Sequence, residues 1–367
     1  MLNVGMVGVG CISGIYLENF ANTFKNIRLV AVCDLIRERA EKARNKYNIP
    51  KIYDTMEELF ADPEIDIVLN LTRPYQHFEV SRLALLAGKH VYSEKPLGAD
   101  FEEGTELVRI ANERGLWIGG APDTFMGAGI QSCRKFIDGG GLGDIIGGRC
   151  VMANHGMESW HPDPDFYYQR GGGPVLDMGP YYITALVNLL GGVKRVYGTC
   201  RTTFKERLIT APPHENEIIQ VNVPTHYECL LTFESGATVS YLTSFDLYNS
   251  HQPNIVLYGT KGNLWVPDPN CFGSENGMRF FDGTENKEVQ LPLEFDYAVN
   301  SRCLGLADLA AAIEQGRSPR ASYRQTYHVL EVMTAIMKSA QTGQPCDISS
   351  KFIREAPMDP SLPHGVL

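Results

Sequence analysis

The sequence predicts an α/β domain built on a doubly wound parallel sheet, followed by an α+β domain with a mostly antiparallel sheet. Two observations carry this prediction. In the first 120 residues, short apolar runs alternate with helical patterns of about ten residues, as in βαβ units. After Gly120, long strand-like runs follow one another with few helices between them. The expected domains are 1–122 and 123–345, with 346–367 as a tail on the surface.

The first domain contains five strand-like runs, namely Asn3–Val7, Ile27–Cys33, Asp66–Leu71, Lys89–Ser93 and Leu116–Gly119. The second of these runs is rich in β-branched residues and is long enough for one buried strand. A helical pattern follows each of the first four runs, over Ile12–Phe24, Arg37–Tyr47, Gln76–Ala87 and Phe101–Arg114. A glycine directly follows the last two patterns, and helices commonly end at such a residue.

The second domain opens with a helix at 130–137 and a glycine-rich turn. Five strand-like runs are expected after it: Ile145–Met152, Arg195–Thr203, His226–Phe233, Ala237–Phe245 and Asn254–Tyr258. Three further helices are expected at Val175–Leu190, Cys303–Gln315 and Tyr323–Thr342. The stretch from Pro345 onward is polar and rich in proline, which predicts the tail.

The composition excludes several classes of protein. A net charge of −10 argues against a nucleic-acid partner, since such proteins are usually basic. No apolar run approaches the roughly 18 residues that a membrane span needs, and the start MLNVGMVGVG lacks the basic residues of a signal peptide. The nine cysteines are scattered and form no CxxC pair, so we expect reduced thiols and a cytoplasmic protein.

A glycine-rich turn connects the first strand to the first helix. It consists of Gly8, Val9, Gly10, Cys11, Ile12, Ser13 and Gly14. Glycine lets the backbone approach a pyrophosphate, and the helix N-terminus offers N–H groups to the phosphates. Asp34 ends the second strand, where a carboxylate accepts hydrogen bonds from the adenosine ribose and repels a 2′-phosphate. This pattern predicts a Rossmann domain that binds NAD rather than NADP. Arg37 and Arg39 lie nearby and would weaken that preference, and a helix N-cap is the alternative role for Asp34.

The segment Glu94-Lys95-Pro96 directly follows the fourth strand. In an open α/β sheet, ligands bind outside the carboxyl ends of the strands, so we expect Lys95 to face the cofactor crevice. A lysine there can give or take a proton if partial burial lowers its pKa. Asp123, at the end of the fifth strand, is expected to face the nicotinamide and the substrate. For Lys95, the alternative to a role in proton transfer is a surface ion pair with Glu94.

These segments resemble the Gfo/Idh/MocA oxidoreductases over residues 1 to about 190. The resemblance rests on the glycine turn, on Asp34, and on three stretches: Thr-Arg-Pro-Tyr-Gln-His at 72–77, Ala-Gly-Lys-His-Val-Tyr-Ser-Glu-Lys-Pro at 87–96 and Gly-Gly-Gly-Pro-Val-Leu-Asp-Met-Gly at 171–179. It implies an NAD(P)-dependent enzyme that acts on a sugar, cyclitol or related polyol. It also implies a second domain with a large open sheet, whose face would form a homodimer or homotetramer.

The resemblance also implies residue roles. Lys95 matches the catalytic lysine of the family, before a proline bond that is usually cis, and Asp177 matches a motif aspartate of the second domain. Arg73 stands where the family often has proline. The expected cofactor contacts outside the glycine turn and Asp34 are Thr72, His77, Glu94, Lys95, Pro96 and, from the second domain, Arg170.

The chain departs from the family four residues after the motif aspartate, where it has Tyr181 and then Tyr182 instead of histidine. The i,i+4 spacing places Asp177 and Tyr181 on one helix face, so both could reach one substrate hydroxyl. A phenol titrates near pH 10 and an imidazole near 6.5. We therefore expect Tyr181 to bind a hydroxyl or to act as an acid with Lys95, and Tyr182 to contact substrate. Aromatic packing of both tyrosines is the alternative.

The segment 155–170 is rich in aromatic and polar residues and contains two prolines. We expect a binding loop in which Trp160 and Tyr168 offer aromatic faces to a sugar ring. His161 would then supply the missing acid or base, and Arg170 would reach the cofactor or an anionic substrate. A solvated crossover loop is the alternative. The acidic and histidine residues of this segment lack the spacing of a metal site, so no metal is expected.

These observations predict an NAD-dependent oxidoreductase that transfers hydride between nicotinamide and a secondary hydroxyl or ketone, with Lys95 moving the proton. Two alternatives stay open. One is glycoside cleavage through oxidation, elimination, hydration and re-reduction at catalytic amounts of NAD. The other is an NAD(H)-binding regulator without turnover, because a fold alone does not define an activity.

Overall fold

The computed structural model describes residues 1–248 and 254–367, which form two compact units. The first unit comprises Met1–Ala128, Phe295–Tyr327 and Glu355–Leu367, and the second comprises Gly129–Glu294 and His328–Arg354. Two segments from the last quarter of the chain thus pack with the first unit, which local sequence patterns do not predict. As functional domains, the expected boundaries at 122 and 345 stay a prediction.

A six-stranded parallel sheet forms the centre of the first unit. Its strands are β1 (Leu2–Val7), β2 (Ile27–Cys33), β3 (Lys51–Tyr53), β4 (Ile67–Asn70), β5 (His90–Ser93) and β6 (Ile118–Gly120). Their order is β3-β2-β1-β4-β5-β6, and every neighbouring pair is parallel. The order reverses between β1 and β4, which is the arrangement of a doubly wound sheet. The predicted fold class of this part is confirmed.

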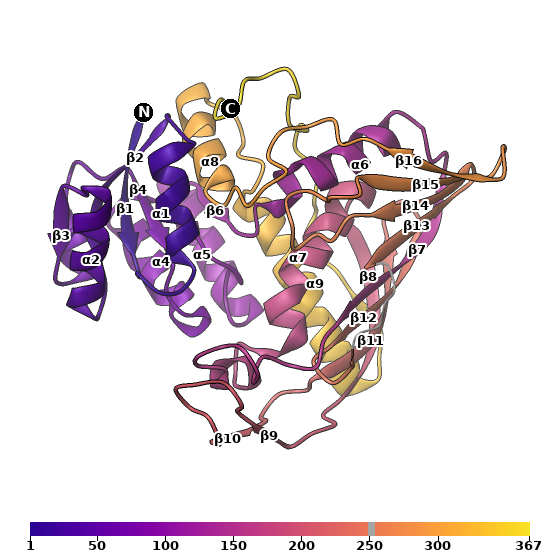
Figure 1. Cartoon of the computed structure of the whole chain (residues 1–367), viewed down its shortest axis with the longest axis horizontal. Coiled ribbons are helices and arrows are strands. Elements are labelled where there is room, and N and C mark those ends of the chain that lie inside the picture. The colour runs from indigo at the N-terminus through magenta and orange to yellow at the C-terminus, as the bar shows by residue number, and fades with distance from the viewer. Residues whose placement is uncertain (249–253) are drawn as a thin grey trace. The chain divides into compact units, whose positions relative to one another are not determined.

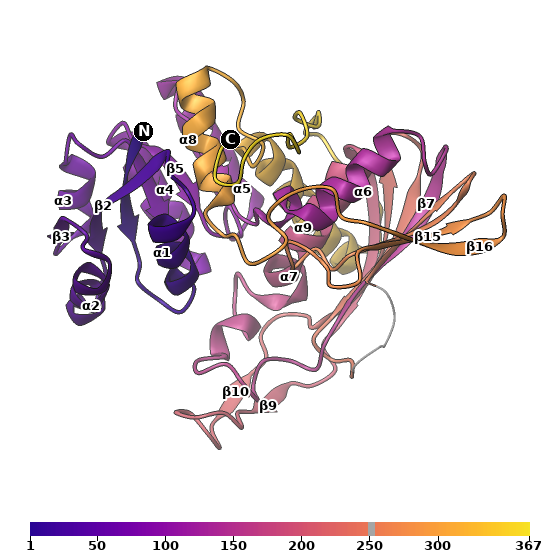
Figure 2. The same cartoon turned by 45° about the horizontal axis from the view of Figure 1, so that its top comes forward.

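Helices cover both faces of this parallel sheet. Figures 1 and 2 show α1 and α2 on one face and α3, α4 and α5 on the other. Their bounds are α1 (Ser13–Asn22), α2 (Arg37–Tyr47), α3 (Met56–Ala61), α4 (His77–Leu86) and α5 (Phe101–Arg114). Short 3-10 turns η1 (Pro74–Gln76) and η2 (Thr124–Met126) follow β4 and β6, and α8 (Leu304–Gln315) packs against β6. With both faces covered, the strand residues form a continuous apolar core.

A nine-stranded mixed sheet forms the centre of the second unit. Its order is β16-β15-β14-β13-β7-β12-β11-β8-β17, and β7 with β12 is its parallel pair among otherwise antiparallel neighbours. The strands are β7 (Ile145–Ala153), β8 (Val193–Arg201), β11 (His226–Phe233), β12 (Thr238–Ser244), β13 (Ile255–Gly259), β14 (Gly262–Val266), β15 (Met278–Asp282), β16 (Lys287–Leu291) and β17 (Cys346–Asp347). The prediction of a large, mostly antiparallel sheet is confirmed.

Helices lie on one face of the mixed sheet. They are α6 (Ala128–Asp138), α7 (Gly173–Leu190) and α9 (Tyr323–Thr342), and α7 contacts β7, β11 and β12 (Figure 1). Within the described part of this unit, no helix covers the opposite face. A separate ribbon of β9 (Glu206–Leu208) and β10 (Ile218–Gln220) lies beside the 3-10 turn η3 (Asp165–Tyr168).

The C-terminal segment contains a short strand and several buried side chains. It begins with β17, which pairs with β8 in the mixed sheet. Arg354 donates to the Asp138 carboxylate over 2.8 Å, and Ile348 and Met358 are buried. All nine cysteines are free thiols. None of the helices in the described ranges is long and apolar enough to cross a membrane.

Candidate functional site: the carboxyl edge of the parallel sheet

The glycine turn after β1 lies where the strand order reverses. Gly8 has φ +96°, and a Cβ there would lie 2.8 Å from the backbone of Leu71, just beyond the end of β4. Glycine is therefore required at this position for both conformation and space. At Gly10 an added Cβ would meet no atom within 4 Å. The turn thus leaves open space above Gly10, as a backbone that cradles a pyrophosphate must.

The Asp34 carboxylate is held against this turn. Its Oδ2 accepts a hydrogen bond from the Val9 N–H over 2.6 Å, and its Oδ1 accepts one from the Ile36 N–H over 2.7 Å. Carboxylate oxygens have further lone pairs, so Asp34 can still accept ribose hydroxyls. Arg37 is paired with Glu41 and Asp54, which directs its charge toward these acids.

Residues after β4 and β5 share the same edge of the sheet. Thr72 lies beyond β4, and its hydroxyl donates to the Asn70 side chain over 2.6 Å. Glu94, Lys95 and Pro96 follow β5, and the Lys95–Pro96 peptide bond is cis, as the resemblance implies. Lys95 is partly exposed. The structure therefore brings the predicted cofactor residues of the first unit to one edge, which we call the carboxyl edge.

His77 connects two loops of the carboxyl edge. Its Nδ1 lies 2.8 Å from the Pro96 carbonyl oxygen and its Nε2 lies 3.0 Å from the Thr72 carbonyl oxygen. The side chain is 1% exposed, and its burial lowers the pKa of the imidazole. This geometry gives His77 the role of holding the Thr72 loop next to the Lys95 loop. Direct contact between His77 and a cofactor stays a prediction.

Glu94 has a partner that the sequence did not indicate. The hydroxyl of Tyr16, on α1, donates to Glu94 Oε1 over 2.8 Å, and the Lys95 N–H donates to Glu94 Oε2 over 3.1 Å. Tyr16 is fully buried. The helix that follows the glycine turn is thereby connected to the Lys95 segment. A buried tyrosine on a helix is ordinary in sequence, so no local signal reveals this contact.

Asp123 follows β6 and is 1% exposed. Its Oδ2 accepts a hydrogen bond from the Gly305 N–H over 3.0 Å, in the first turn of α8. Burial raises the pKa of the Asp123 carboxyl to about 6. The carboxyl thus has a structural partner inside the first unit, and its contact with a substrate stays a prediction.

The second unit presents Asp177 and Tyr181 one turn apart on α7. Asp177 is partly exposed, whereas Tyr181 is 7% exposed. Tyr182 is buried, and its hydroxyl donates to Asp268 over 3.1 Å and accepts from Asn254 over 2.8 Å. Burial raises the pKa of the Tyr182 phenol. Tyr182 is therefore part of the packing between α7 and its sheet, and its predicted contact with substrate is untested.

The segment 155–170, which we call the aromatic loop, presents the side chain of Trp160, whose exposed fraction is 63%. The neighbouring His161 accepts a hydrogen bond at Nδ1 from the Asp163 N–H over 3.0 Å. In a neutral imidazole the other nitrogen then carries the proton, so Nε2–H is a donor. Phe166 and Tyr167 place ring edges against His161, with centroids 5.6 and 5.2 Å away. The loop thus combines an exposed indole with an oriented histidine.

Two other residues of the loop differ in exposure. Tyr168 is fully buried and its hydroxyl donates to Glu158 Oε1 over 2.5 Å. Its contact is with the interior of the loop, so its aromatic face toward a sugar stays a prediction. Arg170 is exposed and lies just before α7, and its predicted contact with a cofactor or an anion is likewise untested.

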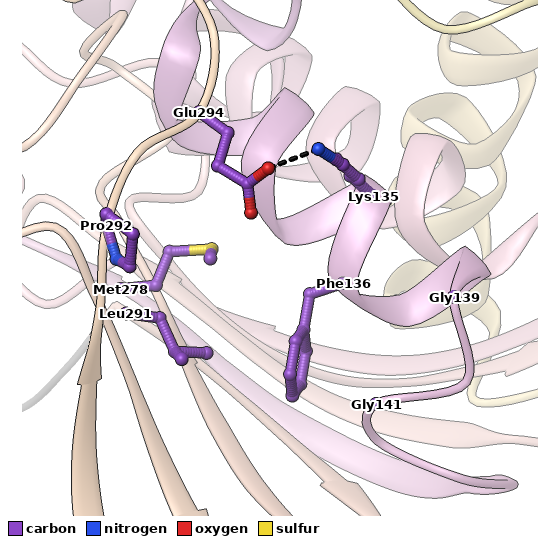
Figure 3. Close-up of a pocket in the computed structure, with 8 residues that line it drawn as sticks. All are labelled: Lys135, Phe136, Gly139, Gly141, Met278, Leu291, Pro292 and Glu294. Carbon is purple, nitrogen blue, oxygen red and sulfur yellow. Dashed lines mark hydrogen bonds and ion pairs between the residues drawn. The ribbon is translucent and has the colours of Figure 1, made fainter.

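A separate pocket of about 230 Å³ lies beside the C-terminal end of α6. Figure 3 shows Phe136, Met278 and Leu291 directed into it, with an ion pair of Lys135 and Glu294 at its edge. It contains none of the predicted site residues. Across residues 1–248 and 254–367, no three His, Cys, Asp or Glu side chains lie together as they would around a metal ion.

The residues at the carboxyl edge fit a dinucleotide. The turn is open above Gly10, Asp34 is anchored beside it, and the strand order reverses at the same place. This is where doubly wound sheets bind dinucleotides. Fold and edge together define a dinucleotide-binding protein of the Rossmann class.

Comparison with known families gives the same result. A family model described as "Oxidoreductase family, NAD-binding Rossmann fold" matches residues 2–119, and one described as "GFO/IDH/MocA C-terminal domain" matches residues 130–265. The chain belongs to the Gfo/Idh/MocA oxidoreductases. The predicted family, enzyme class and NAD cofactor are confirmed.

Individual relatives carry dehydrogenase names. The human trans-1,2-dihydrobenzene-1,2-diol dehydrogenase is 32% identical over 79% of this chain and 80% of its own length. Inositol 2-dehydrogenase from Salmonella paratyphi B is 34% identical over 40% of this chain and 44% of its own length. The fold matches levoglucosan dehydrogenase, solved in complex with NADH and L-sorbose, with a TM-score of 0.79 and 20% identity over 95% of this chain and 99% of that one.

Proposed function

We propose that the protein transfers hydride between NAD and a secondary hydroxyl or ketone of a sugar, cyclitol or related polyol, with Lys95 moving the proton. The position of Lys95 carries this proposal. It directly follows β5 at the carboxyl edge, between a glutamate held by Tyr16 and a proline whose carbonyl faces His77. The constrained backbone fixes where the Lys95 side chain begins at this edge, and an ammonium placed beside the reacting carbon can give or take a proton.

The cofactor supplies the hydride chemistry when it is bound. The chain would hold it through the glycine turn at its phosphates and through Asp34 at the adenosine ribose. Thr72, Glu94 and Lys95 are the residues we assign to its nicotinamide half. Asp34 offers no cation to a 2′-phosphate, which supports NAD over NADP.

The substrate class rests on the relatives' names and on the second unit. Dihydrobenzenediol and inositol both carry hydroxyls on neighbouring ring carbons, and levoglucosan is a sugar derivative. Asp177 and Tyr181, one turn apart on α7, are suited to two adjacent hydroxyls, one group accepting and the other donating. Trp160 would offer its exposed face to the ring. His161, with Nε2–H as donor, would hydrogen-bond a substrate oxygen, because a neutral imidazole is too weak an acid to give up that proton.

Nicotinamide absorbance tests the proposal. NAD would be mixed with cyclic diols, inositols, free sugars and methyl glycosides, and Lys95→Ala would be compared with Lys42→Ala, an exposed lysine on α2. We expect NADH to form with one group of substrates. Lys95→Ala should lower kcat by about 10²- to 10⁴-fold, the usual contribution of a positioned acid or base. Lys42→Ala should behave like the wild type.

Three other results would contradict the proposal. Turnover near the wild-type rate in Lys95→Ala would remove the lysine from the mechanism. Cleavage of a methyl glycoside at catalytic NAD, without net NADH, would favour redox-assisted glycoside cleavage. Tight NADH binding without turnover of any compound in the panel would favour a regulator.

The partner and the compartment are also proposals. The mixed sheet has a face without helices, and we assign this face to contact between copies of the chain. The free cysteines are compatible with a reducing compartment, which supports the expectation of a cytoplasmic protein.

A further inference from the structure

A buried ion cluster lies at the base of the aromatic loop in the second unit. Arg207, on β9, is 7% exposed and lies between two carboxylates. Its Nη1 is 3.2 Å from Glu158 Oε1, and its Nη2 is 2.5 Å from Asp246 Oδ1. Both carboxylates belong to residues that are 8% exposed. Buried charges of this kind persist only when they are paired and hydrogen-bonded.

Arg207 also binds the backbone at the ends of two strands. Its Nη1 donates to the His155 carbonyl over 3.0 Å, and its Nη2 donates to the Phe245 carbonyl over 2.8 Å. His155 follows β7 and Phe245 follows β12, the parallel pair of the mixed sheet. Because parallel strands end at the same edge, one guanidinium can reach both. Its planar arrangement of N–H donors suits four acceptors, which an ammonium cannot match.

The same cluster holds both ends of the aromatic loop. Glu158 lies near the start of the loop and its Oε1 also accepts the hydroxyl of Tyr168, at the other end, over 2.5 Å. A Cβ at Gly156 would lie 2.3 Å from Glu158 Oε2 and 2.5 Å from the Tyr168 hydroxyl, so the base of the loop is closely packed. The segment 159–167 thus lies between Glu158, which pairs with Arg207, and Tyr168, which is hydrogen-bonded to the same glutamate. It contains Trp160 and His161.

We propose that Arg207 is a positioning residue that sets the affinity for substrate by fixing the aromatic loop. This inference rests on the proposed function only in assigning the loop to substrate binding. Arg207 itself touches neither reacting atoms nor cofactor in this assignment. It acts through Glu158 and the His155 carbonyl on the placement of Trp160 and His161.

The test combines a loop readout with kinetics. Trp160 is one of three tryptophans, so replacing Trp117 and Trp265 by phenylalanine leaves it as the reporter. Arg207→Lys and Arg207→Met would be made in this background, with Lys205→Met as control because Lys205 is an exposed cation next to the same ribbon strand. Acrylamide quenching and fluorescence anisotropy of Trp160 report the loop without any substrate. Steady-state kinetics and the Kd of NADH are measured on the same variants.

In both Arg207 variants we expect faster quenching and lower anisotropy of Trp160. We expect KM to rise about tenfold, while kcat per folded molecule and the Kd of NADH stay within about twofold, since the loss would be one of substrate binding alone. Lys205→Met should leave all five values unchanged. Arg207→Lys keeps the charge, so it tests the inference even where Arg207→Met does not fold.

Two results would overturn the inference. One is an unchanged Trp160 signal in Arg207→Lys, which would mean that the arginine does not fix the loop. The other is a mobile Trp160 with an unchanged KM, which would mean that the loop does not set affinity. Failure of the proposed function would look different, because no compound in the panel would be turned over by the wild type.

Discussion

At Asp123, burial determines which protonation state the native fold prefers. The carboxyl is enclosed in the first unit, where water cannot stabilise a negative charge. The Gly305 N–H partly offsets this cost, yet the pKa of the carboxyl still rises to about 6 from its ordinary value of 3.8. Between these two values the native state holds a proton that the unfolded chain releases. Stability therefore falls as the pH rises through this window.

Asp123→Asn should remove this pH dependence. An asparagine can accept the same hydrogen bond from Gly305 and carries no charge. Since one pKa unit corresponds to about 1.4 kcal/mol, the variant should gain about 3 kcal/mol over the wild type between pH 4 and pH 7. Urea denaturation across that range, followed through the fluorescence of Trp117 in a background with Trp160 and Trp265 replaced by phenylalanine, measures the difference. A constant difference between the two proteins would mean that Asp123 is already ionised at pH 4.

At the scale of elements, the turn between β1 and α1 leads to a second prediction. Alanine at Gly10 meets no atom of the chain within 4 Å, so the folded state should accept it. The methyl group would occupy the space that we assign to a pyrophosphate. We expect Gly10→Ala to weaken NADH binding by about tenfold or more, which is about 1.4 kcal/mol.

Fluorescence titration with NADH measures this loss, and the thermal midpoint serves as the internal control. The midpoint should stay near that of the wild type, because the added methyl group has no neighbour in the chain. A fall in the midpoint together with a rise in the Kd would show a folding defect. An unchanged Kd would mean that the pyrophosphate of NADH does not bind in the space above Gly10.

Strands were predictable where an apolar run continued for several residues. The runs at β1, β2, β4, β5 and β6 are all predicted, with bounds that differ by at most two residues. Strand β3 was missed, because its three residues are Lys51, Ile52 and Tyr53 and are only partly buried. The short α3 was also missed, although Thr55 and Glu58 form a capping box that its sequence displays. Whether elements such as β3 and α3 form depends more on packing against neighbouring elements than on their own sequence pattern.

The second unit was less predictable for the same reason. Strands β14, β15 and β16 follow one another in antiparallel pairs, but at least three of the five residues in each are only partly buried or exposed, so no continuous apolar run marks them. Helix α7 was predicted despite an internal proline, because its apolar character continues past Pro180. Strand β17 has two residues and exists only through pairing with β8.

At the scale of the molecule, the candidate site was predictable only where its residues adjoin strands. Glycines and polar residues directly after an apolar run can be assigned to one edge of a sheet, which is how Gly8, Asp34 and Lys95 were identified. Tyr16 and Arg207 have no such marker. Arg207 meets Glu158 and Asp246, which are 49 and 39 residues away in the chain, and no local periodicity encodes such a pairing. The packing of two segments from beyond residue 294 with the rest of the first unit depends likewise on contacts between residues far apart in the chain.

The face of the mixed sheet without helices carries one row of side chains across six strands. The register connects Tyr197 on β8 with Leu230 on β11, and then continues across the sheet through Ser240, Arg149, Val256 and Trp265. Leu230 is 49% exposed and Tyr197 is 41% exposed. Nine strands spaced about 4.8 Å apart make a sheet about 40 Å wide. Such a face can bury the roughly 800 Å² per partner that a stable interface needs.

If this face joins copies of the chain, Leu230→Lys should weaken the assembly. The substitution places a charge in the row between Tyr197 and Ser240, and truncations or charges at central positions of an interface cost about 2 kcal/mol or more. We expect sedimentation velocity to show dissociation at concentrations about tenfold or more above those of the wild type. Ile353→Lys is the matched control, because Ile353 is 85% exposed and lies outside the sheet. Equal masses for the wild type and both variants at every concentration would exclude this face as the interface, since a lysine in the middle of a buried row cannot be neutral.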